Sequence, residues 1–214
     1  MTSCALVGAS DFNGGDFLAR WASGAFDSVI AADAGYAHLE GIGVVPDLAI
    51  GDFDSLGRVP QDVPVLRHPI EKDESDMELA MAHAAGQGFD ELFVYGSLGR
   101  RLDHTIANLQ LFAAYSERGF SVTAIDEGFA LRLLTGPGSF DIPATGLGTV
   151  SVFSAADEAL GVVETGMQYS LDGQTLTNRT SLGLSNELLG QPARVSLERG
   201  TLYIFYPLES PERA

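Results

Sequence analysis

The first 128 residues alternate short apolar runs with segments whose apolar residues recur at helical spacing. This rhythm predicts an α/β fold, a doubly wound parallel sheet with helices on both faces. Helices are expected at 75–86 and 103–118, where apolar residues return every three or four positions. Trp21 follows Phe17 by four residues on another helical segment, so both are expected in the core. The predicted strands cover residues 4–7, 28–32, 48–50, 63–66, 92–95 and 121–125.

The character of the sequence changes near residue 128. Beyond it, glycine, threonine and β-branched residues recur around short apolar runs at 150–153, 160–164, 193–197 and 202–206. The dipeptides Asp172-Gly173 and Arg199-Gly200 are turn signals between such runs, which favours antiparallel pairing. We therefore expect an α/β domain over residues 1–128 and an antiparallel β domain over residues 129–214.

The charge of the chain excludes some partners. Its formal net charge is -17, from 29 acidic and 12 basic residues, which argues against binding to nucleic acid or to an anionic membrane. The single cysteine, Cys4, cannot form an internal disulfide and suits a reducing compartment. No apolar run approaches the ~20 residues that span a bilayer. These features predict a cytoplasmic protein.

Aspartates follow several of the predicted strands. Asp33 ends one strand, and Asp52 and Asp54 follow the next at a spacing that puts both on one side of an extended backbone. Strand ends gather along one edge of a doubly wound sheet, where two bare carboxylates ~4 Å apart repel by about 4 kcal/mol at an effective dielectric of about 20. A hard cation such as Mg²⁺ would relieve that repulsion. In the alternative interpretation these are turn residues, with Asp54 or Ser55 capping the next segment.

The string from Lys72 to Asp76 supports two interpretations that are compatible. Ser75 and Glu78 form a capping box for the helix that follows. Asp76 then opens the first turn, where backbone N–H groups favour an anion and where a phosphate could also bind. Lys72 could reach a phosphate oxygen, or it could simply pair with a neighbouring acid.

A glycine-spaced turn runs from Gly96 to His104, between a predicted strand and a helix. Gly96 and Gly99 allow the backbone to approach a ligand, and the planar guanidinium of Arg101 suits a phosphate. Asp103 is explained equally well as the N-cap of the helix. His104 is of a kind found more often at surfaces than in catalysis.

Six short strings follow one another in a fixed order over most of the chain. They are Asp33-Ala34-Gly35, Pro46-Asp47, Gly51 to Ser55, Lys72 to Asp76, Gly96 to His104 with Asn108, and Ser185-Asn186. In these strings the chain resembles the thiamine pyrophosphokinases. The resemblance implies a homodimer with an N-terminal α/β domain for nucleotide and Mg²⁺ and a C-terminal β-sandwich for dimerisation and the thiamine pocket. It also implies transfer of a pyrophosphoryl group from ATP to the thiamine hydroxyl, giving thiamine diphosphate and AMP.

The resemblance also implies roles for individual residues. The residues implied in catalysis are Asp54, Asp76, Asp103 and Arg101, with Asp54 or Asp103 accepting the proton. Those implied around the metal are Asp33, Asp52, Asp54, Asp76 and Asp103. Those implied in binding ATP or thiamine are Lys72, Asp73, Ser75, Arg101, Asn108, Ser185 and Asn186.

The chain departs from the family pattern at three positions. Ala34 and Arg100 stand where glycine is common, and Ser75 replaces a frequent threonine. Arg100 raises the question of which arginine meets the phosphate. Two other functions are compatible with the same residues: a Mg²⁺-dependent nucleotide or phosphate-ester hydrolase, and a non-catalytic metal- or ligand-binding protein.

Overall fold

The structure, a computed structural model, describes residues 1–143 and 146–208 of the 214-residue chain. The chain forms two compact units, residues 1–111 with 124–127, and residues 112–123 with 128–214. Part of the predicted second domain, 129–214, thus lies outside the described residues. The segment 112–127 holds the end of α4 (Leu102–Glu117) and β6 (Ser121–Ile125), both of which are divided between the units.

The first unit is built on a parallel sheet. Strand β1 (Ser3–Val7) pairs in parallel with β2 (Ser28–Ala32) on one side and with β5 (Glu91–Tyr95) on the other. Strands β3 (Leu48–Gly51) and β4 (Val65–Arg67) extend the sheet beyond β2, again in parallel. The chain therefore moves outward from β1 to β4 and returns to β5 across β1, which makes the β1–β5 boundary a topological switch point. This confirms the predicted doubly wound sheet.

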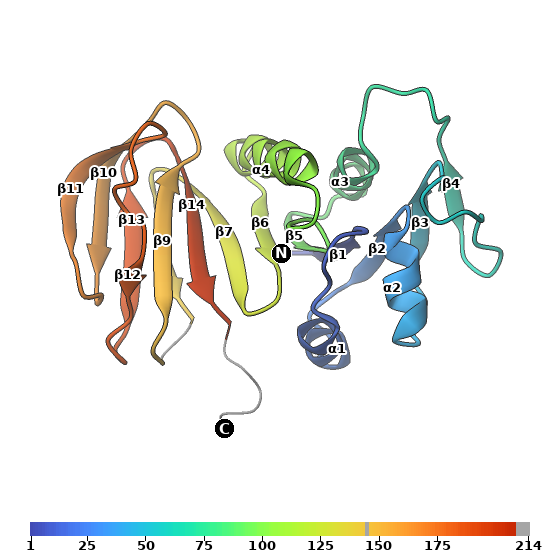
Figure 1. The fold of residues 1–214 in the computed structure, drawn as a ribbon, viewed down its shortest axis with the longest axis horizontal. Coiled ribbons are helices and arrows are strands. Elements are labelled where there is room, and N and C mark those ends of the chain that lie inside the picture. Colours follow the sequence, from blue (N-terminus) through green and yellow to red (C-terminus); the bar gives the residue numbers. More distant parts are fainter. Residues whose placement is uncertain (144–145, 209–214) are drawn as a thin grey trace. The chain divides into compact units, whose positions relative to one another are not determined.

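Helices cover both faces of this sheet, which explains why every residue of β1 is buried (Figure 1). On one face α1 packs the ring of Phe17 against that of Tyr95 at 5.2 Å. On the other face α3 buries Met77 and Met81. The helices that begin in this unit are α1 (Gly14–Ala22), α2 (Gly35–Gly41), α3 (Asp76–Gly86) and α4.

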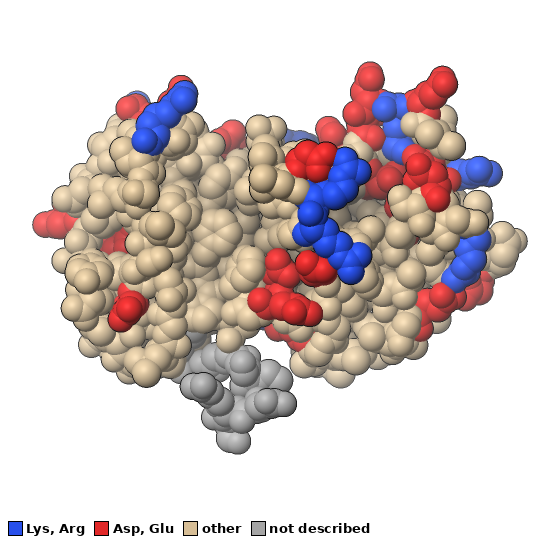
Figure 2. Space-filling model, in the orientation of Figure 1, with Lys and Arg blue, Asp and Glu red and all other residues tan. Residues whose placement is uncertain are grey.

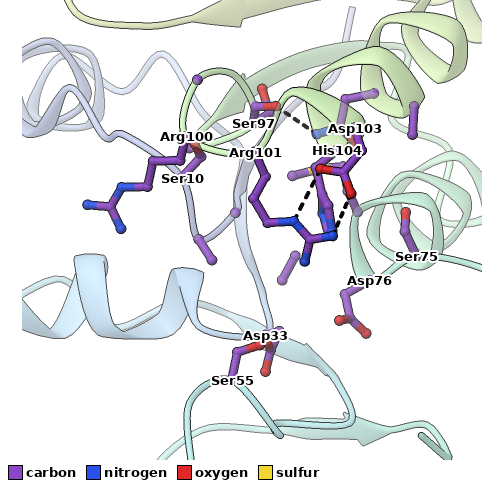
Figure 3. Close-up of a pocket in the computed structure, with 18 of the residues that line it drawn as sticks. Ser10, Asp33, Ser55, Ser75, Asp76, Ser97, Arg100, Arg101, Asp103 and His104 are labelled. Carbon is purple, nitrogen blue, oxygen red and sulfur yellow. Dashed lines mark hydrogen bonds and ion pairs between the residues drawn. The ribbon is translucent and has the colours of Figure 1, made fainter.

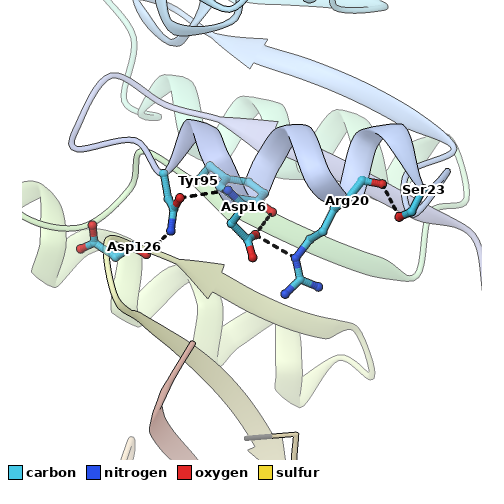
Figure 4. Close-up of polar contacts among 6 residues, drawn as sticks. Asp16, Arg20, Ser23, Tyr95 and Asp126 are labelled. Carbon is cyan, nitrogen blue, oxygen red and sulfur yellow. Dashed lines mark hydrogen bonds and ion pairs between the residues drawn. The ribbon is translucent and has the colours of Figure 1, made fainter. Parts of the chain in front are cut away.

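A chain of polar contacts fastens α1 to the sheet (Figure 4). The Asp16 carboxylate accepts hydrogen bonds from the Tyr95 hydroxyl at 2.7 Å and from Arg20 at 2.8 Å. Asn13 caps the helix by accepting from the Asp16 amide at 3.0 Å, and its side-chain amide donates to the Asp126 carbonyl at 3.1 Å. Because these contacts are all internal to the fold, we assign them a structural role.

The expectation that Trp21 is a core residue is wrong. Phe17 is fully buried, but Trp21 is 47% exposed. Phe26, which follows the helix, packs against Phe17 at 5.5 Å and against Phe93 at 5.4 Å. Phe26 thus closes this side of the aromatic core, and Trp21 in the last turn of α1 stays at the surface.

The second unit contains two antiparallel sheets, ordered β12-β9-β14-β7 and β11-β10-β13-β8. Side chains from the two sheets meet, as in the contact between the rings of Phe140 and Tyr206 at 5.5 Å. The predicted antiparallel sandwich is therefore confirmed. Its strands are β7 (Phe129–Thr135), β8 (Gly138–Ile142), β9 (Thr149–Ser154), β10 (Glu158–Thr165), β11 (Leu171–Thr177), β12 (Asn186–Glu187), β13 (Ala193–Leu197) and β14 (Thr201–Pro207).

One of the two predicted turns is not a turn between strands. Arg199-Gly200 separates β13 from β14, as predicted. Asp172-Gly173 instead lies inside β11, where the pairing register with β10 shifts between Val162 and Glu164. Gly173 has φ 73°, and the dipeptide forms a β-bulge. A bulge and a hairpin turn both need a residue with positive φ, so the same dipeptide suits either.

Two further observations concern the whole of the described chain. Cys4 is buried and unpaired in β1, and burial, reinforced by the charge of Asp47, raises the pKa of its thiol to about 12. No helix among residues 1–143 and 146–208 is both long and apolar enough to cross a membrane.

Candidate functional site

A pocket of about 550 Å³ opens at the carboxyl ends of the strands in the first unit (Figure 3). It lies over the switch point between β1 and β5, where Gly8 and Gly96 follow the two strands. A Cβ on Gly96 would lie 2.2 Å from the Gly8 carbonyl oxygen, so these strand ends can approach only as glycines. The remaining lining comes from the segments after β2 and β3 and from the starts of α3 and α4.

Three aspartates predicted as metal ligands gather at one side of this region. Asp33, Asp52 and Asp54 each offer a carboxylate oxygen, and these oxygens lie within 4.8 Å of one another. Asp33 is only 6% exposed, and its Oδ1 has no hydrogen-bond partner among the described residues. Burial raises the pKa of Asp33, although the Ser55 hydroxyl opposes this. An all-oxygen set with an unpartnered buried carboxylate oxygen fits a hard divalent cation.

Lys72 pairs with aspartates instead of pointing freely into the pocket. Its ammonium nitrogen lies 2.5 Å from Asp52 Oδ2 and 3.1 Å from Asp76 Oδ1, and its side chain is 10% exposed. The hydrogen bond from Lys72 lowers the pKa of Asp52, while burial opposes it. The structure therefore has the arrangement in which Lys72 pairs with neighbouring acids.

Of the other residues between Lys72 and Asp76, some line the pocket and others do not. Ser75 is the N-cap of α3, and its hydroxyl accepts from the Glu78 amide at 3.2 Å, as the capping box predicts. Ser75 and Asp76 line the pocket. Asp73 is exposed and is not part of the pocket lining.

The two neighbouring arginines diverge. Arg101 donates to Asp103 through Nε at 3.2 Å and through Nη2 at 2.5 Å, which lowers the pKa of Asp103 to about 2. In Figure 3 Arg101 extends across the pocket, on the side facing Asp33 and Asp76. Arg100, with φ 38°, turns away and pairs with Asp11 at 2.9 Å.

Residues at the start of α4 complete the wall. Asp103 lies in the first turn of α4 and not at the N-cap, because the helix begins at Leu102. Asn108 is 8% exposed and donates to the Ser97 carbonyl at 2.7 Å, so it holds the glycine-rich loop in place. His104 also lines the pocket.

Two serines that line the pocket were not predicted as site residues from the sequence. Ser10 and Ser97 both border the pocket, and the Ser10 hydroxyl donates to the Leu98 carbonyl. Ser10 lies two residues after Gly8, and Ser97 directly follows Gly96, so each comes shortly after the end of a strand. A glycine directly after a predicted strand at the switch point was the signal that could have found them.

Ser185 and Asn186 belong to the second unit. Ser185 is exposed with φ 59°, and its amide donates to the Ser151 hydroxyl at 3.0 Å. Asn186 is 5% exposed, and its side-chain amide donates to Glu164 at 2.8 Å and to the Tyr169 carbonyl at 2.6 Å. Glu164, which was not predicted, is 1% exposed, and burial raises its pKa. Asn186 thus braces a turn from the inside.

Charge is unevenly distributed over the surface shown in Figure 2. On the visible face of the first unit, basic side chains are bordered by acidic ones, whereas the visible face of the second unit is mostly uncharged. Among the residues that line the pocket, the cations Lys72, Arg100 and Arg101 are each ion-paired with an aspartate.

A doubly wound sheet with a strand-end pocket, an acidic cluster and an arginine across from it has the arrangement of α/β proteins that bind phosphorylated ligands. Comparison with known proteins shows which proteins this chain is similar to. Residues 21–124 match the family model described as the thiamin pyrophosphokinase catalytic domain. The chain is 28% identical over 180 residues to a thiamine pyrophosphokinase of Bacillus subtilis (strain 168), covering 81% of this chain and 84% of that protein. Both matches show that this chain is similar to the thiamine pyrophosphokinases.

Solved structures agree over nearly the whole chain. A thiamin pyrophosphokinase from Geobacillus thermodenitrificans superposes with a TM-score of 0.80 at 25% identity, covering 98% of this chain and 99% of the other. One from Candida albicans superposes with a TM-score of 0.77 at 14% identity, covering 96% and 90%. At that lower identity the likeness shows that the fold is shared.

Proposed function

We propose that this protein is a thiamine pyrophosphokinase that transfers the pyrophosphoryl group of ATP to the hydroxyl of thiamine, forming thiamine diphosphate and AMP. The observation that carries the proposal is the match of residues 21–124 to the catalytic domain of that family, because this segment contains the acidic cluster and Arg101. The comparisons do not favour a nucleotide hydrolase or a non-catalytic binding protein.

The acidic cluster is proposed to hold Mg²⁺ through Asp33, Asp52 and Asp54. The close approach of their oxygens and the unpartnered Asp33 Oδ1 support this assignment. When bound, the ion supplies positive charge that neutralises the phosphates of ATP. Asp76 and Asp103 remain proposed ligands, although each carboxylate is ion-paired in this structure.

The pocket is proposed to bind the phosphates. Arg101 faces the acidic side of the pocket and can exchange Asp103 for a phosphate oxygen, as a charge-assisted bond. Ser75, at the N-terminus of α3, and Lys72 provide further donors, while Asn108 holds the loop that carries Arg101. Asp73, which is exposed and does not line the pocket, is proposed to contact the bound substrate from outside it. Catalysis then depends mainly on positioning and charge neutralisation.

Asp54 is the better candidate for accepting the proton of the thiamine hydroxyl. Asp103 has a pKa of about 2 while Arg101 holds it, which makes it a weak base in that state. Asp54 is exposed and its carboxylate accepts from the Ser55 hydroxyl at 3.0 Å, with no ion pair to a cation among the described residues.

We further propose a homodimer in which the second unit carries the thiamine pocket. Large apolar side chains around Ser185 and Asn186 are exposed, among them Leu182, Leu184 and Tyr169, and such side chains suit burial against a second copy. Asn186 is proposed to shape this pocket by fixing the Tyr169 backbone. A cytoplasmic location fits the unpaired, buried Cys4.

Product analysis tests the activity. The protein is incubated with ATP and Mg²⁺, with and without thiamine, and the nucleotides and thiamine esters are separated. AMP that forms only with thiamine, in step with thiamine diphosphate, supports the proposal, and we expect both products to disappear with excess chelator. ADP or AMP formed without thiamine contradicts it, as does the absence of any turnover.

A further inference from the structure

We propose that Tyr36, Glu40, Arg58 and Asp62 form a clamp that positions the acidic cluster for its metal ion. None of the four lines the pocket, and none belongs to the strings in which the chain resembles the thiamine pyrophosphokinases. The inference rests on the proposed function, because it takes the cluster as the metal site.

The ligands of the cluster come from two separate segments. Asp33 lies in the turn between β2 and α2, so its position depends on where α2 starts. Asp52 and Asp54 lie at the beginning of the loop that joins β3 to β4, residues 52–64. Pairing of β2 with β3 and the hydrogen bond from the Asp33 amide to the Ile50 carbonyl at 2.8 Å bring the two segments together. How the loop rests on α2 then adjusts the distances within the cluster.

The clamp joins these two segments. From α2, the Tyr36 hydroxyl donates to the Asp62 carboxylate at 2.7 Å. Also on α2, Glu40 accepts from Arg58 Nη2 at 2.6 Å through both of its oxygens. The Arg58 guanidinium in turn lies over the Tyr36 ring, 5.5 Å from its centroid. Two loop residues are thus fixed to two α2 residues one helical turn apart.

The loop needs such a restraint for two reasons. The three carboxylates repel one another when no cation is bound, which pushes the loop away from Asp33. In addition, Phe53 adopts φ 64° between Asp52 and Asp54, a backbone conformation that a bulky residue rarely keeps without support from its surroundings. Tyr36 is 3% exposed, so its side of the clamp has a rigid base.

The clamp is tested by metal affinity before any catalysis is measured. Binding of Mn²⁺ to the full chain without nucleotide is followed by the electron paramagnetic resonance signal of the free ion. We expect Tyr36→Phe combined with Arg58→Ala to weaken Mn²⁺ binding by about tenfold, the low end of what loss of outer contacts costs a metal site. In the activity assay the same variant should need more Mg²⁺, with a kcat at saturating Mg²⁺ near that of the wild type.

Two control variants separate positioning from general destabilisation. Arg194→Ala breaks a comparably exposed pair with Asp141 in the second unit and should leave Mn²⁺ affinity unchanged. Asp62→Asn keeps an oxygen for the Tyr36 hydroxyl and should also bind like the wild type. Circular dichroism verifies that each variant is folded at the assay temperature.

The outcomes are distinguishable from failure of the proposed activity. Equal Mn²⁺ affinity in the double variant and the wild type overturns the clamp, and so does a wild-type protein that binds no metal. A wild-type protein that binds Mn²⁺ through a clamp-dependent site, yet forms no thiamine diphosphate, refutes the proposed activity and leaves the clamp standing.

Discussion

Replacing Lys72 with Met tests how the acidic edge is kept stable without metal. Methionine keeps most of the length and apolar volume of the lysine side chain while removing its charge. The change leaves Asp52 and Asp76 without the ammonium that lies 2.5 and 3.1 Å from their oxygens. Asp33 and Asp54 are close enough to Asp52 to share the effect.

The expected loss of stability follows from two opposing energies. At an effective dielectric of about 20, each carboxylate attracts the ammonium by roughly 5–7 kcal/mol. Most of that attraction offsets the cost of removing the charges from water, several kcal/mol per ion. We expect Lys72→Met to lose about 3 kcal/mol of unfolding free energy in chelator at pH 7.5, the low end for breaking a buried pair, since the pocket admits water.

The assay is urea unfolding followed by circular dichroism, with chelator and with saturating Mg²⁺. A divalent ion bound to the folded cluster replaces the missing charge, so Mg²⁺ should reduce the deficit to about 1 kcal/mol or less. Because Lys72 lowers the folded-state pKa of Asp52, its contribution is present above the unfolded pKa of about 3.9 and is lost as the pH falls through the folded pKa. The difference between the proteins should therefore shrink below about pH 4. A chelator-treated variant within about 1 kcal/mol of the wild type, or a deficit that Mg²⁺ does not change, would refute this reasoning.

Three other variants probe the site and the fold. Arg101→Ala should raise the KM for ATP and lower kcat by about 100-fold or more in steady-state kinetics. Arg100→Gly should change either constant by less than about threefold. If Arg100→Gly has the larger effect, the phosphate contact belongs to Arg100. Gly35→Ala puts a Cβ 1.9 Å from a β1 carbonyl oxygen and should cost about 3 kcal/mol in urea unfolding, while Gly41→Ala on the same helix meets nothing within 4 Å and should be neutral or stabilising. Glu164→Gln should raise the melting temperature relative to the wild type at pH 8 but not at pH 4. Burial raises the folded-state pKa of Glu164, so its stabilising contribution is present below the unfolded-state pKa and is lost as the pH rises through the folded-state pKa. An equal shift of the melting temperature at pH 4 and pH 8 contradicts this.

The parts of the fold that sequence reasoning predicted correctly depend on local patterns. The apolar runs that became β1, β2 and β5 are buried on both faces, so their composition alone indicates central parallel strands. Once the sheet is doubly wound, Asp33, Asp52 and Asp54 must meet, because each follows the carboxyl end of a neighbouring strand. The capping role of Ser75 is likewise encoded within four residues.

The parts that could not be predicted depend on contacts between distant segments. Lys72 lies 20 residues from Asp52 in the sequence, and only the pairing of β3 with β4 brings the two together. The helical spacing of Trp21 from Phe17 predicted a core position, but Phe26 fills the aromatic cluster through its contacts with Phe17 and Phe93 and Trp21 stays exposed. A single carboxylate such as Glu164 in a strand gives no sequence signal that it will be buried against Asn186.

Together with the proposed function, the ion pairs around the pocket predict that metal and nucleotide bind cooperatively. Lys72, Arg100 and Arg101 are each bonded to an aspartate, so a phosphate must compete with a carboxylate for any of these cations. A divalent ion on Asp33, Asp52 and Asp54 weakens the hold of Asp52 on Lys72 and makes that exchange easier. By linkage, the nucleotide must then raise the affinity of the cluster for the ion by the same factor. The proposed site would in this way bind an anionic substrate tightly only when the metal is present, and the three pocket cations Lys72, Arg100 and Arg101 would be paired either with an aspartate or with a phosphate.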